Sequence, residues 1–194
     1  MSRPEREIWC DKPAWRGART SLELFGIIAG VIGVALVLGE IWQMNRLSKI
    51  DKALDYVQRY AGAPLLDHRT QVAAVGDEIN AGLRAIGEGA ALTEAQKVVV
   101  LEAYFLSDSA AAEENRGSLM QIVRFYEEIA ICEAQRLCHE QTVCQFFTAP
   151  ARALRRDFGH VYETQGARAG LDGIGSGVTH IAELSCDSLF SPSE

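Results

Sequence analysis

Three cysteines recur at six-residue intervals in the second half of the chain, Cys132, Cys138 and Cys144, and His139 follows the middle one. Thiolates and an imidazole are the ligands that zinc or iron prefers. The spacing does not match the C-x-x-C pairs of zinc knuckles or the C-x-x-C-H pattern of haem attachment. We therefore interpret the three as buried structural thiols, and we assign no metal ligand and no cofactor.

Two alternatives stay open for these cysteines, a disulfide and a metal or redox site. Six residues turn a continuous helix through about 600°, so that neighbouring cysteines point apart. A helix–turn–helix would still bring Cys132 near Cys144. Cys10 and Cys186 have no visible partner in the sequence.

Two adjacent carboxylates, Glu127 and Glu128, stand inside an apolar run. General acid–base catalysis requires a pocket and a raised pKa, neither of which a sequence can supply. We expect one carboxylate to face solvent and the other to form a structural ion pair, with Arg124 or Arg136 as candidate partners, or to contact a partner protein.

Recognisable catalytic and nucleotide-binding patterns are absent from the sequence, including H-E-x-x-H, G-x-S-x-G, the Walker motif and the dinucleotide fingerprint. We predict that the protein is not an enzyme, and we identify no small-molecule substrate. The 194 residues include 19 Lys and Arg against 26 Asp and Glu, a net charge of −7. Because no basic excess is present to neutralise phosphates, nucleic acid is not an expected partner.

An uncharged run of 16 residues, Leu24 to Gly39, lies between Glu23 and Glu40. Counted from Leu22 to Trp42, the 21 residues give a helix of about 32 Å, enough to span a bilayer core of about 30 Å. No small-residue cleavage site follows the run, so we expect a retained anchor rather than a signal peptide. A buried core helix is the other alternative. The predicted transmembrane helix covers residues 21–45, after an N-terminal tail of residues 1–20.

One face of the predicted span carries small residues, because Gly26, Gly30 and Gly33 share a stripe that continues to Glu40. Such faces let a second helix approach closely in lipid, although glycine is also simply common in membrane helices. Trp42 is placed as an interfacial anchor. The predicted partners are the lipid bilayer and another membrane helix, from a second copy or a foreign subunit. The predicted partner-binding residues are Gly26, Gly30, Gly33, Glu40 and Trp42.

The orientation of the span is not decided by its flanks. Five basic residues precede the span, and four lie in residues 46–65. The positive-inside rule cannot choose between five and four.

The rest of the chain is predicted to be helical. Residues 46–165 are predicted to form a small antiparallel helical bundle that opens with a membrane-proximal helix ending near Pro64. Further helices are expected over residues 67–86, from a capping box at Thr93 to Phe105, from a capping box at Ser118 to Leu137, and after a turn near His139. Pro150 is expected to kink or divide this last helix. No strand alternation is visible, so the fold class is all-α.

Two segments are expected to lack regular packing. Residues 107–117 read as a connector that is at most partly helical. Five glycines fall within 12 residues from Gly166 to Gly177, a composition typical of a flexible tail, and we assign residues 166–194 to such a tail. Within it, residues 181–189 are a candidate short helix.

The segments Arg124-Phe-Tyr-Glu-Glu-Ile-Ala130, Glu140-Gln-Thr-Val-Cys-Gln-Phe-Phe147 and Glu40-Ile-Trp-Gln-Met-Asn-Arg46 together resemble an uncharacterised bacterial family. Its members have an N-terminal membrane helix and a helical domain with an Asn-aromatic-aromatic-Glu motif, and Arg124 stands where Asn is usual. The resemblance implies a soluble domain on the cytoplasmic side of the bacterial inner membrane. It brings no catalytic residue.

The sequence thus favours a non-enzymatic single-pass membrane protein that serves as an interaction or accessory subunit of a membrane complex. The alternative is a membrane-tethered metal or redox sensor that uses Cys132, Cys138, His139 and Cys144.

Overall fold

The computed structural model describes residues 13–86 and 93–186, with side chains placed at 28–82, 93 and 96–186. The described part contains six helices and no strand, which confirms the all-helical fold class. The helices are α1 (Pro13–Ala61), α2 (Leu65–Ile86), α3 (Glu94–Phe105), α4 (Ala110–Ala134), α5 (Glu140–Arg168) and α6 (Ser176–Glu183). The chain divides into two compact units, residues 1–47 and residues 48–194.

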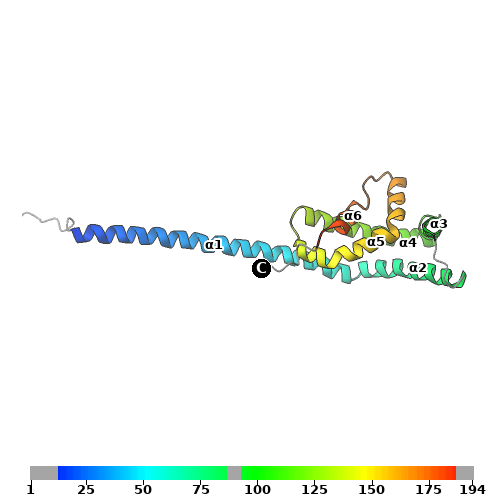
Figure 1. Ribbon diagram of the computed structural model, residues 1–194, viewed down its shortest axis with the longest axis horizontal. Coiled ribbons are helices and arrows are strands. Elements are labelled where there is room, and N and C mark those ends of the chain that lie inside the picture. The colour runs from blue at the N-terminus through cyan, green and yellow to red at the C-terminus, as the bar shows by residue number, and fades with distance from the viewer. Residues whose placement is uncertain (1–12, 87–92, 187–194) are drawn as a thin grey trace, which may run out of the picture. The chain divides into compact units, whose positions relative to one another are not determined.

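The first unit consists of the N-terminal part of α1 (Figure 1). Its apolar side chains are exposed, and the most apolar window of the helix has a mean hydropathy of 1.5 with none of its residues buried. By length and composition, the helix is long and apolar enough to cross a membrane. The helix begins at Pro13, so residues 13–20 are helical and not a tail, because the fixed backbone angle of proline suits the first helical position. Residues 1–12 lie outside the described part.

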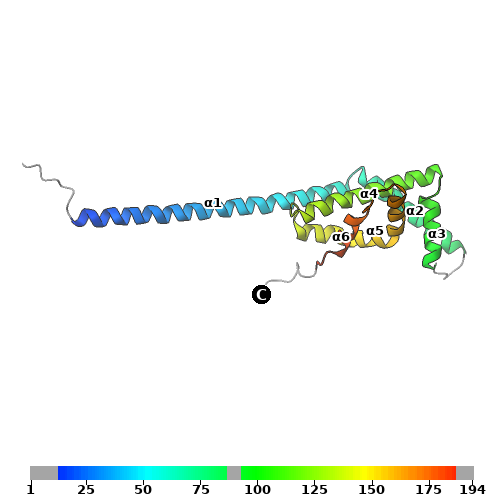
Figure 2. The same ribbon diagram turned by 90° about the horizontal axis from the view of Figure 1, so that it is seen from above.

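The second unit is built around α4, which packs against α2, α3, α5 and α6 (Figures 1 and 2). An aromatic cluster joins the end of α1 to α4 and α5. The ring of Phe125 lies 5.6 Å from that of Tyr60 and 5.9 Å from that of Phe147, and Tyr56 and Tyr126 complete the set. Such ring contacts fix the relative position of three helices within the unit.

Several predicted helix boundaries are confirmed. α1 ends at Ala61, just before Pro64, and α2 ends at Ile86. The capping box at the start of α3 is complete, because the backbone N–H of Gln96 donates to the Thr93 hydroxyl and the Gln96 side chain accepts from the Thr93 backbone. α5 begins directly after His139. It continues through Pro150 as one helix, so a division at this proline is not what the structure has.

The predicted connector at residues 107–117 is wrong, because α4 already begins at Ala110 with Ser109 as its N-cap. The predicted capping box at Ser118 is wrong for the same reason, since Ser118 lies buried inside that helix. Its hydroxyl donates to the side chain of Gln71 at 2.7 Å and lies 3.0 Å from the ring of His68. Ser118, which the local pattern assigned to a helix start, therefore contacts α2 instead.

The predicted flexible tail is also wrong over residues 166–186. Residues 166–168 complete α5, and the chain then folds back as a loop and as α6, which packs against α4 and α5. Val178 and Ile181 are fully buried there. The apolar face of α6 is buried in the core. The free energy gained by this burial offsets the conformational entropy that the glycines lose on folding. Residues 187–194 lie outside the described part.

Candidate functional site

The predicted partner-binding face of α1 can be followed from Gly30 onward, because the surroundings of Gly26 lie outside the described part. Apart from the adjacent residues and the helix's own backbone, no heavy atom lies within 4 Å of a Cβ built on Gly30 or on Gly33. Glu40 is exposed, and so is Trp42, with 65% of its surface open. This part of the helix therefore offers an apolar surface with free room above the two glycines.

The cysteines are paired in two disulfides, Cys132–Cys138 and Cys144–Cys186. The interpretation as structural thiols is therefore wrong, and the disulfide alternative is correct. The sequence suggested that Cys132 could lie near Cys144, but each of these two cysteines is bonded to a different partner. The first bond closes the turn between α4 and α5. The second ties the start of α5 to the residues after α6, 42 positions later in the chain.

The alternative metal site at Cys132, Cys138, His139 and Cys144 is not assembled among the described residues. Among the described residues, no group of three or more His, Cys, Asp or Glu is placed to hold a metal ion. The His139 ring lies 3.0 Å from the hydroxyl of Thr142, and its backbone N–H donates to the carbonyl of Lys49 at 3.1 Å. His139 thus joins the α4–α5 turn to the beginning of the domain.

The structural partner of Glu127 is the start of α6, and not Arg124 or Arg136. Its carboxylate accepts the backbone N–H groups of Gly175 and Gly177, at 2.9 and 3.0 Å, and the hydroxyl of Ser176 at 3.2 Å. These are free donors at the start of α6, and a helix N-terminus favours a negative charge. A carboxylate on α4 therefore caps α6 from a distance of 50 residues in the chain.

The two glycines at this start are required by the close approach of α4 and α5. A Cβ on Gly177 would lie 2.6 Å from the Cα of Glu127, and one on Gly175 would overlap the ring of Tyr162. Gly175 also has a backbone φ of 86°, in the left-handed region. The glycines that suggested flexibility in the sequence thus permit tight packing.

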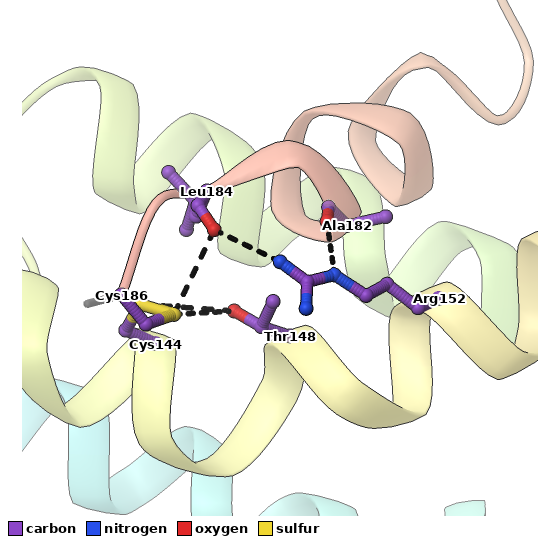
Figure 3. The surroundings of a disulfide bond; sticks show 6 residues. All are labelled: Cys144, Thr148, Arg152, Ala182, Leu184 and Cys186. Atoms are coloured by element: carbon purple, nitrogen blue, oxygen red, sulfur yellow. Dashed lines mark hydrogen bonds between the residues drawn. A yellow bond between two sulfur atoms is a disulfide. The ribbon is translucent and has the colours of Figure 1, made fainter.

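The other end of α6 is held by α5 (Figure 3). The guanidinium of Arg152 donates to the carbonyls of Ala182 and Leu184, at 2.8 and 3.3 Å. A cation at a helix C-terminus complements the partial negative charge of the last carbonyls. Thr148 lies beside the disulfide, with its hydroxyl 3.4 Å from the sulfur of Cys186. Opposite charges from α4 and α5 therefore hold the two ends of α6.

Glu128 forms an exposed ion pair with Arg59 at 2.8 Å. The hydrogen bond to Glu128 raises the pKa of Arg59 above its ordinary value. The prediction that one carboxylate faces solvent is confirmed for Glu128. The expected ion pair of the other carboxylate with Arg124 or Arg136 is wrong, because Glu127 binds the start of α6 instead.

Two buried tyrosines have no hydrogen-bond partner for their hydroxyls among the described residues, Tyr126 and Tyr162. Burial raises the pKa of both phenols, that of Tyr162 to about 12. Tyr126 is one of the residues that line an open groove of about 390 Å³ between α2 and α5. Arg69 also lines this groove, and its guanidinium is stacked on the ring of Tyr60 at 3.7 Å.

The comparisons identify no relative: no protein-family model, no curated protein and no solved structure matches this chain. The resemblance to a bacterial membrane family stays a prediction. The candidate short helix at residues 181–189 was placed too late in the chain, because α6 covers Ser176–Glu183. Sequence reasoning missed its start and its cap, although the apolar spacing of Ile174, Val178 and Ile181 was a usable signal for a buried helical face.

Proposed function

We propose that this protein is a non-enzymatic, single-pass membrane protein of the bacterial inner membrane that serves as an interaction or accessory subunit of a membrane complex. The observation that carries the proposal is the exposed apolar helix with open space above Gly30 and Gly33. In lipid, close approach of two helices at small residues provides the packing that holds them together.

The chemistry-bearing residues of the domain support a structural role for their side chains. Glu127 caps α6, Glu128 pairs with Arg59, and the cysteines C-terminal to the span are in disulfides. These contacts favour a rigid domain for protein binding over the alternative of a metal or redox sensor.

The resemblance implies that the soluble domain is cytoplasmic. We propose instead that the domain lies on the opposite side of the membrane. Disulfides persist outside the cytoplasm and are rare within it. All four cysteines that follow the span are paired, and Cys10 is the single cysteine that precedes it. We therefore infer that the N-terminus is cytoplasmic and that the disulfide-bonded domain faces the oxidising side of the membrane.

A pair of matched glycine variants tests the interaction face. Gly30 and Gly39 both have open surroundings, and nine helical residues place them on opposite faces, about 180° apart. In mild detergent, Gly30→Leu should dissociate the complex of the full chain with its partner or with itself, whereas Gly39→Leu should leave it intact. Equal retention of the complex by both variants would exclude this face as the interface.

Extraction of the unmodified protein, followed by size analysis and mass spectrometry, distinguishes the two kinds of complex. A stoichiometric foreign membrane protein supports an accessory subunit. A particle that contains only this chain supports a homo-oligomer. A single chain per particle, even after gentle extraction, would contradict the proposal.

A further inference from the structure

The turn between α4 and α5, residues 135–139, is held by backbone hydrogen bonds and exposes the apolar side chain of Leu137. The N–H of Leu137 donates to the carbonyl of Cys132 at 2.9 Å, and the N–H of Arg136 donates to that of Glu133 at 2.7 Å. These two bonds form a Schellman motif, which the Cys132–Cys138 disulfide closes. The side chain of Leu137 is nevertheless 43% exposed, and that of nearby Ile131 is 56% exposed.

The turn is bound to the chain close to the end of the proposed span. The N–H of His139 donates to the carbonyl of Lys49, which follows Trp42 by seven residues. Seven helical residues rise about 10 Å, and even fully extended they reach only about 25 Å. Only a short stretch of chain therefore separates the residue that binds the turn from Trp42.

The charge at this end of the domain differs from that of the rest. Residues 46–52 and 135–140 together carry four basic and two acidic side chains, whereas residues 46–194 as a whole carry 14 basic and 21 acidic ones. Among the described residues, Lys49, Lys52 and Arg136 form no ion pair. Asp51, Asp55 and Glu128 line an open groove beside Leu137 together with Lys52, and Glu128 is paired with Arg59. A basic surface near a bilayer is attracted to anionic headgroups.

We propose that the α4–α5 turn is a second membrane contact, in which Leu137 enters the interfacial layer and Arg136, with Lys49 and Lys52, binds anionic phospholipid headgroups. The inference rests on the proposed membrane anchor. The tether supplies the bilayer at high local concentration, so that a small apolar contact with a few basic side chains is sufficient for binding. The contact would fix the orientation of the domain on the membrane, and with it the face that is presented to a partner.

Site-specific photo-crosslinking tests this contact in the full chain, reconstituted in nanodiscs that contain anionic phospholipid. A diazirine analogue of leucine replaces Leu137 in one sample, Leu171 in a second and Leu36 in a third. Leu171 is a matched control, because it is 53% exposed and follows the opposite end of α5. Leu36 lies in the proposed span. We expect lipid adducts at positions 137 and 36, and several-fold fewer at 171.

The outcomes separate this inference from the proposed function. Adducts at position 36 without adducts at 137, or equal adducts at 137 and 171, would overturn the membrane contact while leaving the anchor in place. A cross-link from position 137 to a second copy of the chain would overturn it in favour of an oligomer interface. If position 36 gives no lipid adduct, the membrane anchor itself fails.

A charge variant tests the basic part of the contact. Arg136→Gln should lower the lipid adducts at position 137 several-fold in anionic nanodiscs. Arg124→Gln is the control, because Arg124 is an exposed arginine inside α4, 12 residues before Arg136 and about 18 Å of helical rise away from the turn. Equal adducts in the two variants would show that headgroup charge has no part in the contact.

Discussion

The carboxylate of Glu127 on α4 accepts the backbone N–H of Gly177 at the start of α6, at 3.0 Å. The same carboxylate accepts the N–H of Gly175 at 2.9 Å. α6 has only eight residues, too few for a stable isolated helix. Its position therefore depends on contacts supplied by α4 and α5, and these contacts determine how the C-terminal segment contributes to the domain.

Glu127→Gln should destabilise the domain by about 1 kcal/mol, because the amide keeps one acceptor but loses the charge that faces the helix start. Chemical denaturation of the detergent-solubilised full chain, followed by circular dichroism, measures the change. Glu128→Gln is the matched control, since its exposed ion pair with Arg59 is expected to contribute less than about 1 kcal/mol. A larger loss from Glu128→Gln than from Glu127→Gln would contradict the assigned cap.

Gly177→Ala and Gly117→Ala should shift stability in opposite directions. The added methyl group at 177 would meet backbone atoms of Glu127, and such overpacking costs about 1–3 kcal/mol. Gly117 lies within α4 with open surroundings, so alanine there should stabilise the helix by about 0.5–1 kcal/mol. The midpoints of thermal unfolding test the pair, and a neutral Gly177→Ala would show that α6 is free to move away.

The burial of Tyr162 predicts a loss of stability at alkaline pH. Its pKa is raised from 10.0 to about 12 in the folded state. The unfolded chain therefore releases this proton first, so that the contribution of the group is fully present below pH 10 and falls as the pH rises toward 12. Unfolding at a series of pH values measures the slope, which should be smaller in Tyr162→Phe. An unchanged slope would exclude Tyr162 as its source.

Arg136 occupies the left-handed position that ends α4, with a backbone φ of 55°. Side chains other than glycine are strained there, so Arg136→Gly should raise the stability by about 1 kcal/mol. The same change removes a basic side chain from the proposed membrane contact. We expect a domain that is more stable and yields fewer lipid adducts at position 137. A loss of stability in Arg136→Gly would show that the guanidinium has a stabilising contact within the domain.

Signals that are local in the sequence predicted the corresponding parts of the fold. The Thr93 capping box, the end of α1 before Pro64 and the start of α5 after His139 each depend on residues within one or two turns. Ser118 shows where this reasoning fails. It has the pattern of a capping box, but its hydroxyl binds Gln71, 47 residues earlier, inside a longer helix.

The connections of α6 could not be predicted for the same reason. Glu127 and Gly177 are 50 residues apart, and Cys144 and Cys186 are separated by 42. Glycine-rich composition is identical in a flexible tail and in a tightly packed loop, and only the neighbouring side chain distinguishes the two. The apolar run of α1, which needs no distant partner, was predicted directly from the sequence.

The most direct test of the central claim, a membrane-anchored domain on the oxidising side, is thiol labelling in intact cells. A membrane-impermeant maleimide should label none of the cysteines until an impermeant reductant is added, and should then label the four that form Cys132–Cys138 and Cys144–Cys186. Cys10 should be labelled only after the membrane is permeabilised. If the four domain cysteines react without reductant, and only after permeabilisation, the domain lies in the cytoplasm and the account is contradicted.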